Sequence, residues 1–242
     1  MTAIQNEKKL KMKIAGFRKT SLIDYPDNIS AVLFTQGCNC RCIYCHNPEL
    51  VTCEPEGKEY MDLDYFWNFL EERGHLLDGV VITGGEPTLQ PGIIDFIDKI
   101  KTINLKVKLD TNGSNFAVVK QLVRNNFVDY WAVDVKASFG KYEEIVQKGE
   151  VVEDVKKSIN LIKQSENNHE FRTTVVPGYH DHQELGKIAK IITGAEKYCI
   201  QNFRPDITLK EKLQEKRQFP EEKLGEFKGI ADKYIGKVVI RN

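Results

Sequence analysis

The feature that most constrains this chain is a group of four cysteines crowded into one short loop. Cys38, Cys42 and Cys45 stand at C-x3-C-x2-C spacing, with Cys40 between the first two, soon after the apolar run 31–34. Three thiolates on one loop can bind three irons of a cubane iron–sulfur cluster and leave the fourth iron without a protein ligand. Such an iron can bind and reduce another molecule. The spacing therefore predicts an open cluster held by Cys38, Cys42 and Cys45.

Other uses of these cysteines fit the sequence less well. Zinc sites typically pair two distant C-x2-C knuckles and the chain has only one, so structural zinc is kept as the alternative. Disulfides between such crowded cysteines would be strained, and a reducing compartment disfavours them. Cys40 is expected to be a free thiol, because a fourth ligand would close the open iron. Cys53 and Cys199 are expected to fill small apolar spaces, with an accessory role for Cys53 left open.

Composition and charge narrow the class of protein. The 242 residues are 41% hydrophobic, enough for a full core, and α/β barrels of this length commonly form one domain. The 35 basic and 35 acidic residues cancel, and Lys and Arg are spread along the chain, so no nucleic-acid partner is expected. No apolar run is long enough to span a bilayer, and segment 1–13 lacks the apolar core of a signal peptide. We expect a cytoplasmic protein with no membrane contact.

Strand-like and helix-like patterns alternate along the chain. The expected strands are 29–35, 79–83, 105–110, 130–135, 170–176, 198–203 and 237–241. The expected helices are 63–74, 93–101, 116–125, 152–162, 185–192 and 220–234. Strands separated by such helices form right-handed βαβ units in a parallel sheet. We therefore predict an α/β fold, a partial, open (β/α)6 barrel in one domain over 29–242, with a strand or hairpin extension over 1–28.

Polar groups follow several of the predicted strands, at the carboxyl ends where α/β sheets collect their chemistry. The glycine pair 84–85 allows close backbone approach to a ligand, and Glu86 offers a carboxylate to a cationic amine. Segment 110–114 carries hydroxyl, amide and carboxylate groups suited to a sugar or a bound cation. Asp134 and Lys136 lie on one face of the next strand, although such a pair also occurs on ordinary surfaces.

The sequence resembles the radical S-adenosylmethionine (SAM) superfamily, and within it the activating enzymes of glycyl radical enzymes. The superfamily resemblance rests on the cysteine spacing and on Gly-Gly-Glu-Pro at 84–87. The runs 19–26 and 34–38 and the Cys-His-Asn-Pro ending at 45–48 are similar to the anaerobic ribonucleoside-triphosphate reductase activating type. The similarity extends from this first run to Arg204 and therefore covers most of the chain.

The resemblance implies a [4Fe–4S] cluster on the three predicted cysteine ligands, with SAM chelating the open iron through its amino and carboxylate groups. The residues implied as SAM contacts are Tyr44, Gly84, Gly85, Glu86, Asn112 and Lys136. Among them Glu86 matches the motif that receives the SAM amino group, and Lys136 matches the lysine that pairs with the SAM carboxylate. The resemblance implies no catalytic side chain beyond the cluster and SAM.

Further assignments come from the same resemblance. Asp110 and Asp134 resemble the carboxylates that hold a monovalent cation beside SAM in pyruvate formate-lyase activators. Arg204 lies near the position where those activators carry a histidine, and it is assigned as a SAM or partner contact. Cys40 departs from the pattern, since an apolar residue is usual there.

The chemistry implied is reductive cleavage of SAM by an electron from reduced flavodoxin or ferredoxin. The products are methionine and a 5′-deoxyadenosyl radical, which takes a hydrogen from a backbone glycine of a glycyl radical enzyme, here an anaerobic ribonucleoside-triphosphate reductase. Two alternatives stay open. One is a radical SAM enzyme acting on a small molecule or peptide, and the other is a non-catalytic iron–sulfur or zinc-binding electron carrier.

Overall fold

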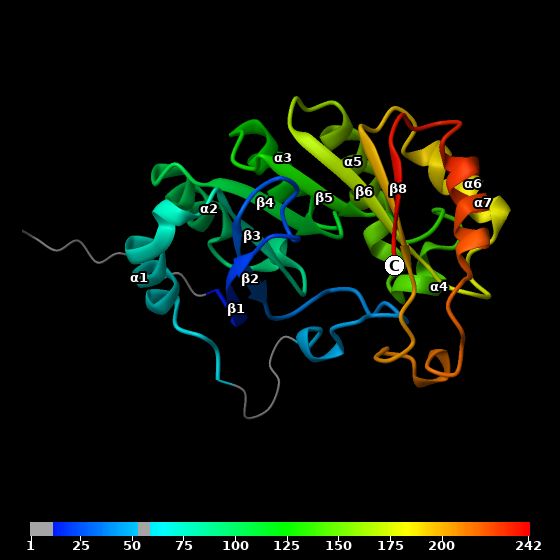
Figure 1. Cartoon of the computed structure of the whole chain (residues 1–242), viewed down its shortest axis with the longest axis horizontal. Helices are drawn as coiled ribbons and strands as arrows, with labels where there is room; N and C mark the ends of the chain where they lie inside the picture. The colour runs from blue at the N-terminus through cyan, green and yellow to red at the C-terminus, as the bar shows by residue number, and fades with distance from the viewer. Residues whose placement is uncertain (1–11, 53–58) are drawn as a thin grey trace, which may run out of the picture.

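The computed structural model describes residues 12–52 and 59–242, which form an eight-stranded sheet (Figure 1). The strands lie side by side in chain order: β1 (Ile14–Ser21), β2 (Ser30–Thr35), β3 (Gly79–Gly84), β4 (Lys106–Thr111), β5 (Tyr130–Asp134), β6 (Asn168–Val175), β7 (Lys197–Asn202) and β8 (Val238–Arg241). β1 pairs antiparallel with β2, and each later pair is parallel. The expected N-terminal strand thus joins the main sheet at one edge, while a domain boundary after residue 28 stays a prediction.

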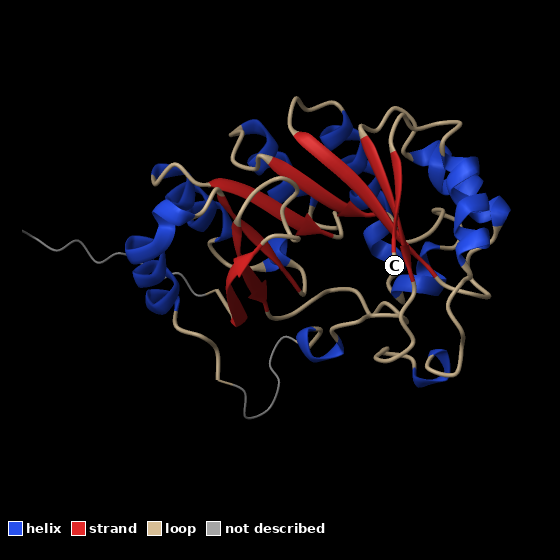
Figure 2. Cartoon of the chain, viewed as in Figure 1, coloured by secondary structure: helices blue, strands red, loops and turns tan. Residues whose placement is uncertain are grey.

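Helices connect the parallel strands and lie around the outside of the curved sheet (Figure 2). They are α1 (Leu63–Arg73), α2 (Ile93–Thr102), α3 (Phe116–Arg124), α4 (Tyr142–Val146), α5 (Val152–Lys163), α6 (His182–Ile191) and α7 (Glu221–Ala231). Six strand–helix units and a final strand confirm the predicted partial, open (β/α)6 barrel. Only α4 is missing from the sequence prediction, because five residues are too few to show a helical period. A helix able to cross a bilayer is not found in the described parts of the chain.

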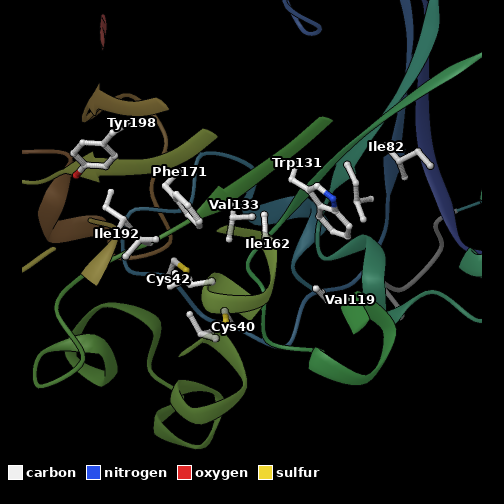
Figure 3. Close-up of a cluster of buried hydrophobic side chains, with 14 of the residues drawn as sticks. Cys40, Cys42, Ile82, Val119, Trp131, Val133, Ile162, Phe171, Ile192 and Tyr198 are labelled. Atoms are coloured by element: carbon white, nitrogen blue, oxygen red, sulfur yellow. The ribbon is translucent and has the colours of Figure 1, made fainter. Parts of the chain in front are cut away.

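The main core lies between the helices and the outer face of the sheet. In α2, Ile93, Phe96 and Ile97 are buried because their spacing puts them on one helical face. The strands contribute alternate residues, such as Trp131 and Val133 of β5, to the same core (Figure 3). Each fully buried side chain of this size contributes roughly 1.5–3 kcal/mol. This layer holds the sheet in its curved form.

The inner face of the sheet carries different side chains. On the part formed by β2 and β3, Tyr25, Val32 and Val81 form a small separate apolar cluster. Strand alternation places the residues between the core positions on this inner face, including Arg172 of β6, whose guanidinium reaches the carboxylates of β4 and β5. A charged layer therefore lies inside the barrel, next to the apolar cluster.

Candidate active site

A cavity of about 240 Å³ opens at the carboxyl ends of the parallel strands. It brings together most of the predicted site residues: Cys38, Cys42, Cys45, Tyr44, Gly84, Gly85, Asp110, Asn112, Asp134 and Lys136. Glu86 and Arg204 do not line it. A larger hollow of about 510 Å³ at the other end of the barrel contains none of these residues. Tertiary folding thus collects these residues from the cysteine loop and from the ends of β3, β4 and β5 into one site.

The cysteine loop is held in place by backbone hydrogen bonds to α4. The amides of Arg41 and Ile43 donate to the carbonyls of Val146 and Ile145, at 2.9 and 3.0 Å. Cys42 and Cys40 are buried and belong to the core cluster, where Figure 3 labels them. The short helix that the sequence pattern does not reveal is therefore a support of the cluster loop.

The thiols of the loop influence one another. A hydrogen bond from the Cys40 thiol lowers the pKa of Cys42 to about 7, although burial opposes the shift, and the charge of Lys136 acts in the lowering direction. The Cys40 thiol also lowers the pKa of Cys38, while burial raises the pKa of Cys45 to about 11. Because the thiolate is the form that binds metal, two of the three predicted ligands are already biased toward it. Metal binding itself deprotonates a coordinating thiol.

The three predicted ligands suit a cluster better than a single ion. Within residues 12–52 and 59–242, no three His, Cys, Asp or Glu side chains are arranged to hold one metal ion. A cubane cluster needs no such convergence, because each thiolate binds a different iron. Cys38, Cys42 and Cys45 all face the same cavity, beside the cationic Lys136. The donor set therefore fits a [4Fe–4S] cluster.

The glycine pair after β3 is required by the neighbouring backbone. Gly84 has φ +109°, and a Cβ there would lie 2.4 Å from the backbone nitrogen of Thr35. A Cβ on Gly85 would lie 2.2 Å from the carbonyl oxygen of Gly37. The amide of Gly85 donates to the carbonyl of Thr35 at 2.9 Å. The two glycines thus let the end of β3 pack directly against the start of the cysteine loop.

Glu86 has an environment that its motif does not reveal. Its side chain is buried and accepts hydrogen bonds from the hydroxyls of Thr88 and Thr111, at 2.5 and 2.6 Å. It also accepts the backbone amides of Thr88 and Asn112, at 3.1 and 2.7 Å. Burial raises the pKa of Glu86, and these donors act against the shift. In this arrangement Glu86 joins the ends of β3 and β4, and its contact with a SAM amine stays a prediction.

Asp110 and Asp134 form a charged layer with Arg172 inside the barrel, next to the cysteine loop. Arg172 was not among the site residues predicted from the sequence. Arg172 Nη1 lies 3.0 Å from Asp110 Oδ2, and Arg172 Nε lies 2.9 Å from Asp134 Oδ1. Lys108 also pairs with Asp110, and Lys136 Nζ lies 3.0 Å from Asp134 Oδ2. Burial alone would raise the pKa of both aspartates, but the neighbouring cations, with Arg172 first, lower it below the usual value. Both carboxylates are therefore ionised at neutral pH.

A signal for Arg172 is present in the sequence. Glu170, Arg172 and Thr174 occupy alternate positions of one predicted strand, so their polar side chains share a face. In a barrel whose helices cover the outer face, such a polar face must point inward. Arg172 and Thr174 do line the cavity.

The remaining predicted positions lie elsewhere. Arg204 is exposed and lines a separate shallow hollow with Lys216 and Arg217. Cys199 is buried, as its prediction as a filler requires. Cys53 lies outside the described residues.

Comparisons with known proteins agree with this geometry. The Radical SAM superfamily model matches residues 32–190. A Methanocaldococcus jannaschii protein, provisionally named a glycyl-radical enzyme activating enzyme, is 38% identical over 237 residues, covering 96% of this chain and 97% of that protein. The pyruvate formate-lyase-activating enzyme of Clostridium pasteurianum is 29% identical over 189 residues, covering 74% of this chain and 76% of that one.

A solved structure shows the same fold. The crystal structure of Streptococcus suis SuiB bound to S-adenosylmethionine matches with a TM-score of 0.67 at 12% identity. The match covers 86% of this chain and 48% of that longer chain. Taken with the superfamily match and the full-length relative, the cysteine loop and its cavity identify the chain: it belongs to the radical SAM superfamily.

Proposed function

We propose that this radical SAM enzyme activates a glycyl radical enzyme by taking a hydrogen from one of its backbone glycines. The observation that carries the proposal is the shared cavity of Cys38, Cys42 and Cys45, with cationic and amide groups opposite them. The names of the relatives in Methanocaldococcus jannaschii and Clostridium pasteurianum support the type of substrate. Anaerobic ribonucleoside-triphosphate reductase is the proposed partner, and reduced flavodoxin or ferredoxin is the proposed electron donor.

In this proposal the three cysteines hold a [4Fe–4S] cluster and the strand ends hold SAM. Bound there, these groups would provide for reductive cleavage of SAM once an electron is delivered. Lys136 pairs with the SAM carboxylate, and Asn112 lies near the ribose. Tyr44, which is buried, packs by the adenine and helps to keep water from the reacting atoms.

Cys40 lies among the three predicted ligands and contacts the side chains of two of them. The Cys40 thiol lowers the pKa of both Cys38 and Cys42, and Asn112 Nδ2 lies 3.5 Å from the Cys40 sulfur. In the proposed enzyme Cys40 lies beside the ligands but does not bind iron itself. The fourth iron therefore stays open to SAM.

The first test is anaerobic reconstitution of the cluster, followed by addition of dithionite and SAM. The wild-type protein should bind iron and sulfide and release 5′-deoxyadenosine. Replacing Cys38, Cys42 or Cys45 by alanine should abolish both cluster binding and SAM cleavage. Cys40→Ala should retain cleavage, and Cys199→Ala is the matched control for loss of a buried thiol outside the cavity. Retained cleavage in any of the three ligand variants, or zinc in the anaerobically purified protein, would overturn the assignment.

The second test concerns the substrate. Co-incubation with an anaerobic ribonucleotide reductase or a formate-lyase-like protein should give the electron paramagnetic resonance doublet of a glycyl radical. If SAM is cleaved but no candidate protein gives the doublet, a small molecule or peptide is the substrate instead. If 5′-deoxyadenosine is never formed by the loaded protein, the chain is an electron carrier.

A further inference from the structure

The charged layer below the cysteine loop differs from what a bound cation needs. The resemblance to pyruvate formate-lyase activators predicts a monovalent cation between Asp110 and Asp134. In this chain, Arg172 lies between them and contacts both, at 3.0 and 2.9 Å. A hard cation is held by several oxygen lone pairs that point at it. The available oxygens therefore decide whether a cation fits.

All four carboxylate oxygens already have cationic donors. On Asp110, Oδ1 pairs with Lys108 and Oδ2 accepts from Arg172. On Asp134, Oδ1 accepts from Arg172 and Oδ2 from Lys136 at 3.0 Å. Asp110 Oδ2 also accepts the hydroxyl of a neighbouring threonine on β3 at 3.1 Å. A metal ion bound to these oxygens would lie directly beside the cationic side chains, and their positive charge opposes its entry unless one of them is displaced.

The net charge of the layer also disfavours a bound cation. Two carboxylates face three cationic side chains, so the layer carries a net charge of +1 before any ion enters. The side chains of Lys108, Lys136 and Arg172 are only 5%, 11% and 13% exposed, so solvent screens them little. Breaking a buried ion pair by removing one partner is strongly destabilising, because it leaves an uncompensated buried charge. The pair of carboxylates does not fit a monovalent cation while Arg172 is in place.

We propose that the guanidinium of Arg172 takes the structural place of the monovalent cation, so that SAM binding by this enzyme does not depend on sodium or potassium. Arg172 is then a positioning residue: it holds Asp134, and through Asp134 it orients Lys136 toward the cavity. The inference rests on the proposed function for the location of SAM in this cavity.

The main experiment uses the wild-type enzyme with its cluster reconstituted. SAM affinity is measured by equilibrium dialysis in potassium chloride and in tetramethylammonium chloride at equal ionic strength, because tetramethylammonium is too large for a site between two carboxylates. The dissociation constants should agree within about twofold, since screening is matched. Tighter binding by about tenfold or more in potassium would overturn the proposal.

Replacing Arg172 should make SAM binding depend on potassium. In Arg172→Met the carboxylates lose their shared donor, so SAM binding in tetramethylammonium should weaken by about tenfold and recover at least partly in potassium. Arg172→Lys keeps a cation in the layer and should stay independent of potassium. Arg18→Met removes an exposed arginine from the edge strand β1 and controls for loss of one positive charge. A potassium response in Arg172→Lys but not in Arg172→Met would contradict the proposal.

A second readout separates this proposal from the proposed function. Thallium(I), a potassium substitute, is titrated into the reconstituted protein and followed by its nuclear magnetic resonance. The wild-type protein should show no saturable binding, whereas saturable binding that Asp134→Asn abolishes would overturn the proposal. This result needs no bound SAM. If the loaded enzyme fails to bind SAM in either salt, the proposed function fails, and thallium still decides whether a cation site exists. Circular dichroism verifies that each variant is folded.

Discussion

Two charged clusters lie on the inner face of the same sheet, and their carboxylates are paired with cations in different ways. The upper cluster, near the carboxyl ends, consists of Lys108, Asp110, Asp134, Lys136 and Arg172. The lower cluster, near the amino ends of β5 to β7, consists of Tyr130, Glu170, Lys197 and Arg241. Strand β6 supplies Arg172 to the upper cluster and Glu170 to the lower one. These two residues are two positions apart, so their side chains lie on the same face of the strand.

The clusters differ in how their carboxylates are used. Glu170 is fully buried and accepts two hydrogen bonds from Arg241, both at 2.8 Å, and one ion pair from Lys197 at 2.9 Å. It thereby ties β6 to β7 and to the edge strand β8. In the upper cluster one arginine is shared by two carboxylates, and four of its five members line the cavity. The lower cluster is expected to contribute to stability, and the upper cluster to ligand binding as well.

The largest effect is expected from the lower carboxylate. Glu170→Gln leaves Arg241 and Lys197 without their counter-charge. Breaking a fully buried pair costs roughly 3–5 kcal/mol, and because Arg241 is 40% exposed and partly solvated, the lower end of this range is expected. Urea unfolding should show this loss in the free energy of unfolding. SAM cleavage by the folded variant should be unchanged. A loss below about 1 kcal/mol, the range of exposed pairs, would mean that the cluster is not a stabilising contact.

Two lysines then compare the clusters directly. Lys136→Met removes the proposed partner of the SAM carboxylate, so SAM affinity should fall by about 10- to 100-fold, the value of a charge-assisted hydrogen bond. Lys197→Met removes a similarly buried lysine from the lower cluster and should change SAM affinity by less than about twofold. Equilibrium dialysis of both reconstituted variants measures this difference. Equal losses in the two variants would remove the functional distinction between the clusters.

The pH dependence of stability tests the lower cluster without disrupting the fold. Burial opposes ionisation of Glu170, but the hydrogen bonds from Arg241 and Lys197 outweigh it and lower its pKa. A lowered folded-state pKa means that the stabilisation is present above the unfolded-state pKa, about 4.3, and is lost as the pH falls through the folded-state value. The stability gap between wild type and Glu170→Gln should therefore narrow below about pH 4.3. A gap that is constant or widens with acid would contradict this assignment.

The smallest effect is expected from Tyr130, whose hydroxyl lies 3.1 Å from Glu170 Oε2. Tyr130→Phe removes the hydrogen bond to Glu170 and a long one of 3.5 Å from Lys197 Nζ, but leaves both cations on the carboxylate, so the expected loss is roughly 1 kcal/mol. Thermal and urea unfolding measure it, with Tyr65→Phe as a control at an exposed position on α1. A loss as large as that of Glu170→Gln would show that the phenol is a main partner of the carboxylate.

Much of the fold was predictable because its signals are local. Helical periodicity and short apolar runs predict the order of strands and helices, and six of the seven α-helices in the described residues agree with it. Helix α4 shows the limit: it is too short for a period, yet its carbonyls hold the cysteine loop. The positions of the predicted site residues follow from a general rule, since the carboxyl ends of parallel strands meet at one edge of a sheet.

The sequence by itself determined the family, the cysteine ligands as a prediction and the alternation that builds the barrel, because each depends on residue types at fixed spacing. Only the tertiary structure decided what surrounds these groups. Glu86 is enclosed by hydroxyls and amides of β4 and of its own turn, and Arg172 lies between carboxylates from two other strands. Such partners are far apart in the chain, and the spacing of a motif carries no information about them. The cysteine loop was readable from the sequence, but its charged neighbours depend on packing across the barrel.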